Sequence, residues 1–331
     1  MLNKKSILIT GGTGSFGKAF LETVIKKFKK VEKLVIFSRD ELKQWDLKKT
    51  FPEAKYPNLR YFIGDIRDKE RTIRAFRGID YVVHAAALKQ IDTAEYNPDE
   101  FIKTNVVGSQ NIVEACLENN VKKVIALSTD KACAPSTLYG ATKLCSERIF
   151  LAANNIKGNK KINFSVVRYG NVVGSRGSVV PLLFDMKKNN KKIFNLTHAD
   201  ATRFWISLDE SIEMVLWSLK NIDDAMILVP KLRTLLIKDL AKIIYPECKV
   251  KITGLRAGEK IHEDLISLNE TNAYDIGKYY CLLAPSVPLN KIKMDFRKKM
   301  NENFFLRSDA KKLLLNRYEI IKSLKKLNFE V

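Results

Sequence analysis

The sequence predicts a doubly wound α/β fold, in which a parallel Rossmann-type sheet is followed by a smaller C-terminal substrate lobe. Short apolar runs alternate with helical patterns over the first half of the 331 residues, and a glycine-rich turn follows the first run. This rhythm loosens after about residue 171. We therefore expect a Rossmann domain over residues 1–170. Residues 171–331 should form mainly a substrate-binding lobe, with some segments packing back on the first domain.

The predicted strands of the first domain are short apolar runs bounded by turns. Helix-like stretches separate them, at 16–30, 99–119 and 138–155 among others. Apolar strands separated by helices form a parallel sheet that is covered on both faces, and its ligands bind beyond the carboxyl ends of the strands. The runs cover residues 6–10, 33–38, 59–65, 80–86, 123–129 and 164–170.

The second half has a less regular pattern. Residues 179–190, 207–220 and 237–245 are predicted helices, and 225–230 is a predicted strand. A further helical pattern at 308–326 lies in a tail rich in lysine and arginine. It is predicted to be either a docked cap or a partner surface.

The net charge of +21 raises the question of nucleic-acid binding. The lysines, however, fall into separate clusters at 26–30, 187–192 and 322–326, without the interleaved aromatic residues that a base-stacking surface requires. We interpret them as solvated faces that also steer an anionic substrate, and expect no nucleic-acid partner.

Location and metal content are predicted from what the sequence lacks. A strand pattern begins at Ser6 without signal-peptide anatomy before it, and no apolar run approaches the roughly 18 to 20 residues that span a bilayer. A cytoplasmic protein without membrane insertion is expected. Five scattered cysteines and three distant histidines predict reduced thiols and no metal site.

The glycine-rich turn after the first strand has glycines at positions 11, 14 and 17. Glycine permits a tight turn and a close backbone approach, and the N-terminus of the following helix offers N–H groups to a pyrophosphate. A strand before the turn and a helix after it strengthen the prediction of a dinucleotide site, which includes Gly11, Thr13, Gly14, Ser15, Phe16 and Gly17.

The end of the second strand predicts which dinucleotide binds. An acidic residue usually meets the ribose of NAD at this place, but here Ser38 and Arg39 come first and Asp40 only afterwards. A hydroxyl and a guanidinium suit a 2′-phosphate, so we expect NADP rather than NAD. Lys43 either adds to this site or is a surface residue, and Asp65 is placed to touch the adenine.

Tyr139 and Lys143 are four residues apart, so a helix places both on one face. A nearby ammonium lowers the pKa of a tyrosine, so we expect Tyr139 to act as a base toward a hydroxyl. Thr129 is placed to hydrogen-bond the same hydroxyl. Asp130 and Lys131 add an acid and a base that hydride transfer alone does not need; by spacing they also fit an exposed salt-bridged loop.

With these motifs, the chain resembles the extended short-chain dehydrogenase/reductases that act on nucleotide sugars. More narrowly, the chain resembles the inverting UDP-N-acetylglucosamine 4,6-dehydratases of the pseudaminic acid pathway. The similarity covers residues 6 to about 265, in order. Its stretches are "ITGGTGSFGK", "SRDELKQ", "IGDIRD", "HAAALKQ", "AEYNP", "TNVVGSQN", "ALSTDKA", "LYGATK", "RYGNVVGSRGSVVP", "TRFWISLDE" and "GLRAGEKIHE".

The resemblance implies a hydro-lyase that forms a 6-deoxy-4-keto sugar with inversion at carbon 5. Tyr139 would take the proton of the 4-hydroxyl, with Lys143 and Thr129 in support. Lys131, if burial keeps it neutral, would remove the proton of carbon 5, and Asp130 would protonate the hydroxyl that leaves carbon 6. The two groups titrate as a coupled unit, so assigning each proton to one residue is provisional.

The resemblance also implies ligand-binding residues and a homo-oligomer. The UDP-sugar would be held by Lys89, Asn171, Arg176, Arg203, Arg256 and Glu259, with the arginines on the diphosphate. Ile66, Ala86 and Lys89 would join the cofactor site, and Asn105 would support the cofactor or the catalytic helix.

Other functions remain open at this point. A UDP-hexose 4-epimerase needs the same cofactor turn and the Tyr139/Lys143 pair, but has no use for Asp130 and Lys131. A retaining 4,6-dehydratase of the same family protonates carbon 5 from the other face, and the family resemblance implies an acidic residue in such enzymes at the position of Lys131. A nucleotide-sugar or RNA-binding module without catalysis is suggested only by the charge, and fold alone would not decide.

Overall fold

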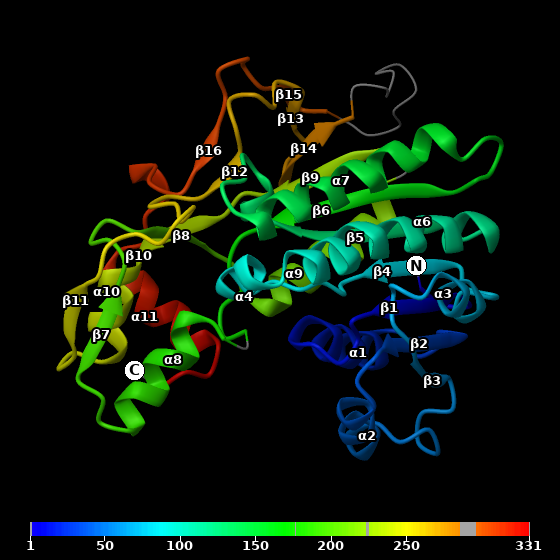
Figure 1. The fold of residues 1–331 in the computed structure, drawn as a ribbon, viewed down its shortest axis with the longest axis horizontal. Helices are drawn as coiled ribbons and strands as arrows, with labels where there is room; N and C mark the ends of the chain where they lie inside the picture. Colours follow the sequence, from blue (N-terminus) through cyan, green and yellow to red (C-terminus); the bar gives the residue numbers. More distant parts are fainter. Residues whose placement is uncertain (1, 176, 223–224, 285–295, 331) are drawn as a thin grey trace.

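The structure is a computed structural model that describes residues 2–175, 177–222, 225–284 and 296–330 (Figure 1). Its centre is a sheet in the order β15-β13-β14-β9-β6-β5-β4-β1-β2-β3. The parallel part consists of β1 (Ser6–Thr10), β2 (Lys33–Ser38), β3 (Leu59–Ile63), β4 (Tyr81–His84), β5 (Lys123–Thr129), β6 (Asn163–Tyr169) and β9 (Met226–Pro230). This parallel core confirms the predicted doubly wound fold.

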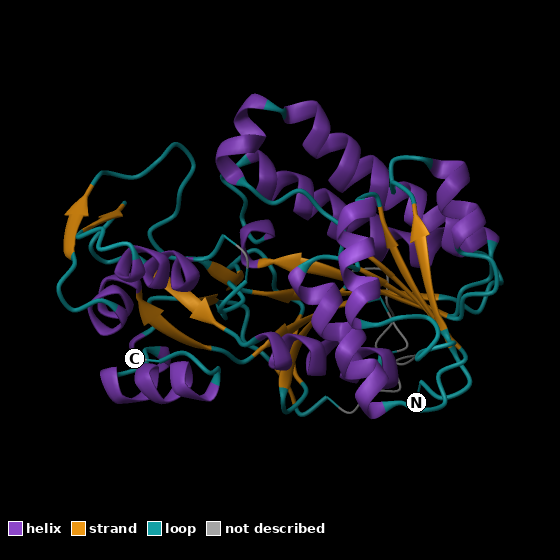
Figure 2. Ribbon diagram, turned by 90° about the horizontal axis from the view of Figure 1, so that it is seen from below, coloured by secondary structure: helices purple, strands orange, loops and turns teal. Residues whose placement is uncertain are grey.

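Helices cover both faces of the sheet (Figure 2). On one face α1 packs beside α9, and on the other α6 packs between α3 and α7. The strands between them are buried on both faces, which explains their near-continuous apolar sequence. These helices are α1 (Ser15–Lys27), α3 (Lys69–Ala75), α6 (Gly108–Glu118), α7 (Leu138–Ile156) and α9 (Leu208–Asn221); α2 (Glu41–Thr50), α4 (Ile91–Tyr96) and α5 (Pro98–Phe101) complete the first domain.

The strand order reverses at β1, which has β2 on one side and β4 on the other. The chain runs outward from β1 to β3, then returns to β4 and continues in the opposite direction. Connections therefore leave β1 and β4 on opposite faces of the sheet. A crevice opens at such a switch point, beyond the carboxyl ends of the strands.

Residues after 171 contribute to two parts of the molecule. The strands β14 (Tyr279–Leu283), β13 (Ala273–Asp275) and β15 (Lys298–Lys299) extend the main sheet beyond β9 by antiparallel pairing. The C-terminal lobe has its own apolar core, which includes Leu183 and Leu240. This lobe contains α8 (Val179–Lys188), α10 (Ile237–Ile244), β7 (Ile193–Leu196) paired with β11 (Lys249–Ile252), and β8 (Thr202–Trp205) paired with β10 (Arg233–Leu236).

The tail forms a shorter helix than the pattern over 308–326 predicts. The structure has β16 (Leu306–Arg307), which pairs with β12 (Asp264–Ile266), then a 3₁₀ turn over Lys311–Leu313 and α11 (Arg317–Lys326). Asn316 begins α11 because its side chain accepts a hydrogen bond from the backbone N–H of Glu319, whose carboxylate accepts one from Asn316 in return. Ile320 and Leu324 are buried in the lobe core, so α11 is a docked cap.

Across these described ranges, no helix combines the length and the apolar character needed to cross a bilayer.

Candidate active site

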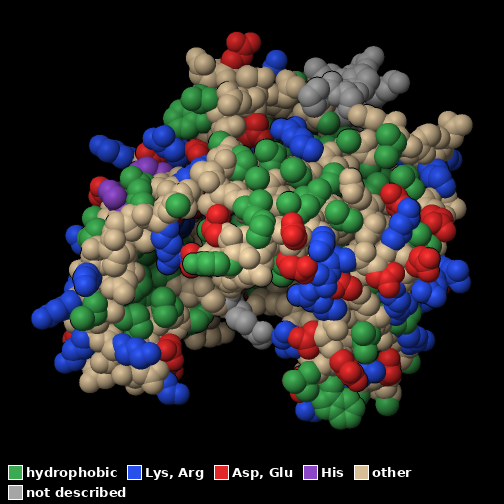
Figure 3. Space-filling model, in the orientation of Figure 1, with side chains coloured by type: hydrophobic (Ala, Val, Ile, Leu, Met, Phe, Trp, Pro, Cys, Tyr) green, Lys and Arg blue, Asp and Glu red, His purple; other side chains and the backbone are tan. Residues whose placement is uncertain are grey.

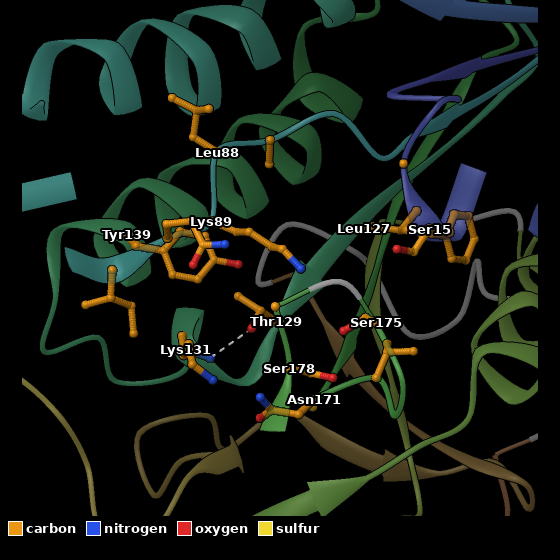
Figure 4. A pocket seen from close by; sticks show the side chains of 18 of the residues that line it. Ser15, Leu88, Lys89, Leu127, Thr129, Lys131, Tyr139, Asn171, Ser175 and Ser178 are labelled. Atoms are coloured by element: carbon orange, nitrogen blue, oxygen red, sulfur yellow. Dashed lines mark hydrogen bonds between the residues drawn. The ribbon is translucent and has the colours of Figure 1, made fainter. Parts of the chain in front are cut away.

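A cavity of about 920 Å³ lies beyond the carboxyl ends of the parallel strands. In the space-filling view the molecule is hollowed between the C-terminal lobe and the first domain (Figure 3). Figure 4 shows Thr129, Lys131, Tyr139 and Asn171 close together, with Ser15 of the glycine turn opposite them. Apart from Asn105, every site residue predicted from the sequence and described by the structure lines this cavity. Arg176, predicted to bind substrate, lies outside the described residues.

The glycine turn is shaped by backbone contacts that exclude side chains. Gly11 has a φ of +65°, and a Cβ there would lie 2.9 Å from the Cα of Ala86. A Cβ on Gly17 would lie 2.4 Å from the carbonyl oxygen of Gly12. The helix α1 then begins after Gly14 without a side-chain cap, and Ser15, Phe16 and Gly17 of its first turn line the cavity. This cradle fits a dinucleotide pyrophosphate.

The predicted binding site for the cofactor ribose contains Ser38, Arg39 and two carboxylates, each of which is paired with a cation. Asp40 caps α2 by accepting from the backbone N–H of Lys43, and hydrogen bonds from Lys43 hold the pKa of Asp40 below its ordinary value. Burial opposes ionisation of Asp65, but its ion pair with Arg67 at 2.7 Å keeps the pKa of Asp65 low. Arg39 lies 3.7 Å from Asp65 and is half exposed.

Tyr139 and Lys143 lie in the first turns of α7, and both are buried. The Lys143 ammonium donates to the carbonyl oxygen of Leu127 at 2.8 Å, and burial lowers the pKa of Lys143 to about 8. Burial raises the pKa of Tyr139 to about 12, although the charge of Lys131 and a hydrogen bond with Thr129 act in the opposite direction. The predicted lowering of the Tyr139 pKa by Lys143 is therefore wrong. Burial raises this pKa, and the cation that opposes the rise is Lys131.

Asn105 connects the cavity wall to the catalytic helix. It lies in a π-helical segment, Ile102–Val107, between α5 and α6. Its amide accepts from the backbone N–H of Leu88 and donates to the carbonyl of the same residue, both at 2.9 Å, and also donates to the hydroxyl of Thr142 at 3.0 Å. Asn105 therefore fixes the loop that carries Lys89 against α7. The π-helical turn brings its amide inward, as such turns often do at functional sites.

Asp130 and Lys131 follow β5 in a 3₁₀ turn, Asp130–Ala132, and they do not form an exposed loop pair. Asp130 is fully buried. Its Oδ1 accepts from the Thr129 hydroxyl and from Lys131 Nζ, each at 3.0 Å. Its Oδ2 is buried and has no hydrogen-bond partner among the described residues. A buried carboxylate oxygen without a partner is rare in folded proteins, because such polar atoms are usually hydrogen-bonded.

The surroundings of Lys131 favour its protonated form. Burial opposes its charge, but Asp130 and Glu263 together hold the pKa of the ammonium above its ordinary value. Burial raises the pKa of Asp130, although the charge of Lys131 acts against it. The expectation that burial keeps Lys131 neutral is therefore wrong. Sequence reasoning missed Glu263, which lies at the end of "GLRAGEKIHE" and reaches Lys131 only through the tertiary fold.

The predicted substrate residues that the structure describes all line this cavity. Arg203 is held in place by the carbonyl oxygens of Thr202 and Ile261, at 2.8 and 2.9 Å. Glu259 accepts from the Thr197 hydroxyl at 2.9 Å. Arg256 forms an exposed ion pair with Asp92 at 3.1 Å, so a substrate must compete with that carboxylate for its guanidinium.

A buried ion cluster lies behind the catalytic helix. Arg168 of β6 is completely buried and donates to Glu147 of α7 and to Glu270, with the closest contacts at 2.7 and 2.8 Å. Burial opposes the charge, but these two carboxylates hold the pKa of Arg168 well above its ordinary value. The cluster fixes α7 to the sheet and to the segment after β12. Within the described residues, no group of acidic, histidine or cysteine side chains has an arrangement that would hold a metal ion.

The sequence and the fold are similar to those of known proteins. The chain matches the family model described as polysaccharide biosynthesis protein over residues 7–284. It is 47% identical to a Campylobacter jejuni protein named UDP-N-acetylglucosamine 4,6-dehydratase (inverting), with 97% of each chain covered. It is 39% identical to a Rickettsia bellii protein named UDP-glucose 4-epimerase, over 100% of this chain and 94% of the other. The solved structure of Pen from Bacillus thuringiensis matches with a TM-score of 0.90 and 32% identity, over 99% of both chains.

Proposed function

The chain belongs to the polysaccharide biosynthesis protein family, and from this we propose that it is an inverting UDP-N-acetylglucosamine 4,6-dehydratase. The product would be the 4-keto-6-deoxy sugar of L-arabino configuration, the type used for pseudaminic acid. One observation carries the proposal: an acid–base pair, the buried Asp130 and the partly buried Lys131, lines the same cavity as Tyr139 and Lys143. An oxidoreductase or epimerase needs only the second pair.

The cofactor of the proposal is NADP, held by the glycine turn and by Ser38 and Arg39. When bound, it supplies the hydride acceptor for carbon 4 and the hydride donor for carbon 6. The protein's own part is positioning. Arg203 and Arg256 would hold the diphosphate of the UDP-sugar, because guanidinium groups match phosphate oxygens by paired hydrogen bonds.

Tyr139 would accept the proton of the 4-hydroxyl as a phenolate. The charge of Lys131 and a hydrogen bond with Thr129 favour this form, and burial disfavours it. At rest Tyr139 is therefore a neutral phenol, and the population of the reactive phenolate rises with pH. A base near the reacting hydroxyl is required because the 4-ketone forms only as that proton leaves.

The elimination would use Asp130 and Lys131 after one proton has moved between them. Lys131 Nζ lies 3.0 Å from Asp130 Oδ1. Moving a proton across this hydrogen bond gives a neutral amine and a carboxylic acid without changing the net charge. The amine is then the base for carbon 5, and the acid protonates the hydroxyl that leaves carbon 6. The raised pKa of the buried Asp130 favours this transfer.

Incubation with UDP-N-acetylglucosamine in D₂O tests the proposed function. We expect NMR of the product to show loss of water, one deuterium at carbon 5, and ring-proton couplings of the inverted configuration. Inversion requires that a proton returns to carbon 5 on the face opposite to the one from which the first proton left, and the similarity to a protein named as an inverting dehydratase supports this outcome. A product that retains its configuration at carbon 5 would contradict the inverting assignment.

A UDP-hexose 4-epimerase is the second candidate, because a relative of similar length carries that name. The same experiment separates the two activities. An epimerase would return a hexose with a changed configuration at carbon 4, with carbon 6 still hydroxylated and no solvent deuterium at carbon 5.

Replacing Arg39 by alanine should weaken NADP(H) binding by roughly tenfold or more, since a charge-assisted hydrogen bond contributes about 1.5–3 kcal/mol. NAD(H), which lacks the 2′-phosphate, should lose far less. Isothermal titration with both cofactors measures the difference, and Lys48→Ala on α2, the helix that follows Arg39, is the control. Equal affinities of the wild-type protein for the two cofactors would refute the NADP assignment.

A further inference from the structure

Glu263 is a buried carboxylate that faces the catalytic lysine from the C-terminal half of the chain. It precedes β12 and is 4% exposed. Its position is fixed by Ser308, the residue after β16, since its backbone N–H donates to the Ser308 hydroxyl and its carbonyl accepts from the Ser308 N–H, both at 2.9 Å. Its Oε1 lies 3.3 Å from Lys131 Nζ.

Charged or titratable side chains from three other places in the chain lie around this contact. Asp130 meets Lys131 Nζ at 3.0 Å from the 3₁₀ turn. Arg203 of β8 lies 3.8 Å from Glu263, and two backbone carbonyls hold its guanidinium in place. The phenol of Tyr139, on α7, is also affected, because the charge of Lys131 lowers its pKa. Lys131 is therefore held between two carboxylates, and Arg203 approaches the same Glu263 oxygen, Oε1, as Lys131 does.

We propose that Glu263 is a positioning residue for the elimination: its carboxylate holds Lys131 Nζ beside Asp130 and sets the pH at which Lys131 releases its proton. This inference rests on the proposed dehydratase function for its catalytic meaning. The contact itself is independent of substrate. Nothing in the reaction scheme above requires a second carboxylate on Lys131, yet the fold buries one there.

The proton movement in this group is balanced. The N–H bond of the Lys131 ammonium breaks and an O–H bond forms at Asp130 Oδ1, while Glu263 stays an anion paired with Arg203. The group of Asp130, Lys131, Glu263 and Arg203 has the same net charge before and after. Because Glu263 attracts the ammonium and not the neutral amine, it holds the proton on Lys131 and opposes the transfer. Removing its charge should therefore favour the neutral amine.

Glu263→Gln tests this because it removes the charge and keeps the side-chain shape. The purified protein is pulsed with acetic anhydride at a series of pH values, and acetylation of Lys131 is followed by peptide mass spectrometry. Only the neutral amine reacts, so a lowered pKa appears as a labelling midpoint at lower pH. We expect the Glu263→Gln midpoint below that of wild type, with a parallel shift in the pH dependence of product release.

Asp264→Asn is the matched control. Asp264 is the next residue, and it pairs with Lys260 at 3.4 Å rather than with Lys131. Its midpoint for Lys131 should equal that of wild type. A Glu263→Gln midpoint that is unchanged, or that moves to higher pH, overturns the proposal. A midpoint that shifts equally in Asp264→Asn also overturns it, because a general loss of negative charge would then explain the shift.

Two further measurements keep the test decisive. In the wild-type protein, the pH midpoint for acetylation of Lys131 should lie above that of a free lysine side chain. A lower midpoint overturns the proposal. Glu263→Asp keeps the charge but shortens the reach, so the midpoint should stay near that of wild type while kcat for water loss falls. Acetylation of Lys131 does not depend on turnover. If no dehydrated product forms, the proposed function is refuted, while the acetylation midpoints still test the effect of Glu263 on Lys131.

Discussion

Replacing Lys131 by alanine should lower the rate of water loss by about 10²–10⁴-fold, the usual contribution of a positioned acid or base. The substitution removes the base for carbon 5. It also leaves the buried carboxylates of Asp130 and Glu263 without the cation between them. Product formation from UDP-N-acetylglucosamine, followed by NMR, measures the effect.

Lys131→Arg separates the two consequences of that change. A guanidinium keeps the positive charge beside Asp130, Glu263 and Tyr139, but it does not give up its proton in proteins. This variant should fold as wild type and still fail to eliminate water. Oxidation at carbon 4, seen as reduced nicotinamide in a single turnover, should survive in it. A Lys131→Ala protein that releases dehydrated product at a near-normal rate would exclude the assigned role.

The second large effect is expected on stability. Arg168→Met should lower the free energy of unfolding by about 3–5 kcal/mol, because it leaves Glu147 and Glu270 as buried carboxylates without their shared cation. Urea denaturation followed by circular dichroism measures the change. The variant should also be more sensitive to rising pH, since the uncompensated carboxylates ionise as pH rises.

Lys69→Met is the matched control for that measurement. Lys69 forms an ion pair with Glu114 in which both side chains are about half exposed, and such pairs contribute little to stability. Its unfolding curve should stay close to that of wild type. An Arg168→Met protein as stable as this control would show that the buried cluster does not hold α7 and the sheet together.

The parts of the site that depend on neighbouring residues could be predicted from the sequence. The glycine turn, the strand end at Ser38 and Arg39, and the Tyr139/Lys143 spacing each follow from one strand–turn–helix unit. Their local geometry is set by secondary structure, so periodicity and spacing suffice to place them. The alternating pattern of apolar strands and helices likewise determines the parallel sheet, because covered strands must be apolar on both faces.

The electrostatics of the site could not be predicted in this way. The charge state of Lys131 depends on Glu263, which lies 132 residues further along the chain by the numbering. The pKa of Tyr139 depends on how deeply α7 is buried, which spacing does not report. The tail shows a similar limit: its apolar periodicity extends over 308–326, but the capping box at Asn316 decides where the helix begins.

The position of β9 has a consequence for how the chain folds during synthesis. All seven residues of β6 are buried, and β9, which covers one edge of β6, comes more than 50 residues later in the chain. Until Met226–Pro230 leaves the ribosome, β6 is an open, apolar sheet edge able to pair with another nascent chain. The antiparallel strands that follow must wait for β9 in turn. Translation pauses or truncations between residues 170 and 226 should therefore favour aggregation, whereas chains that extend past β14 close this edge.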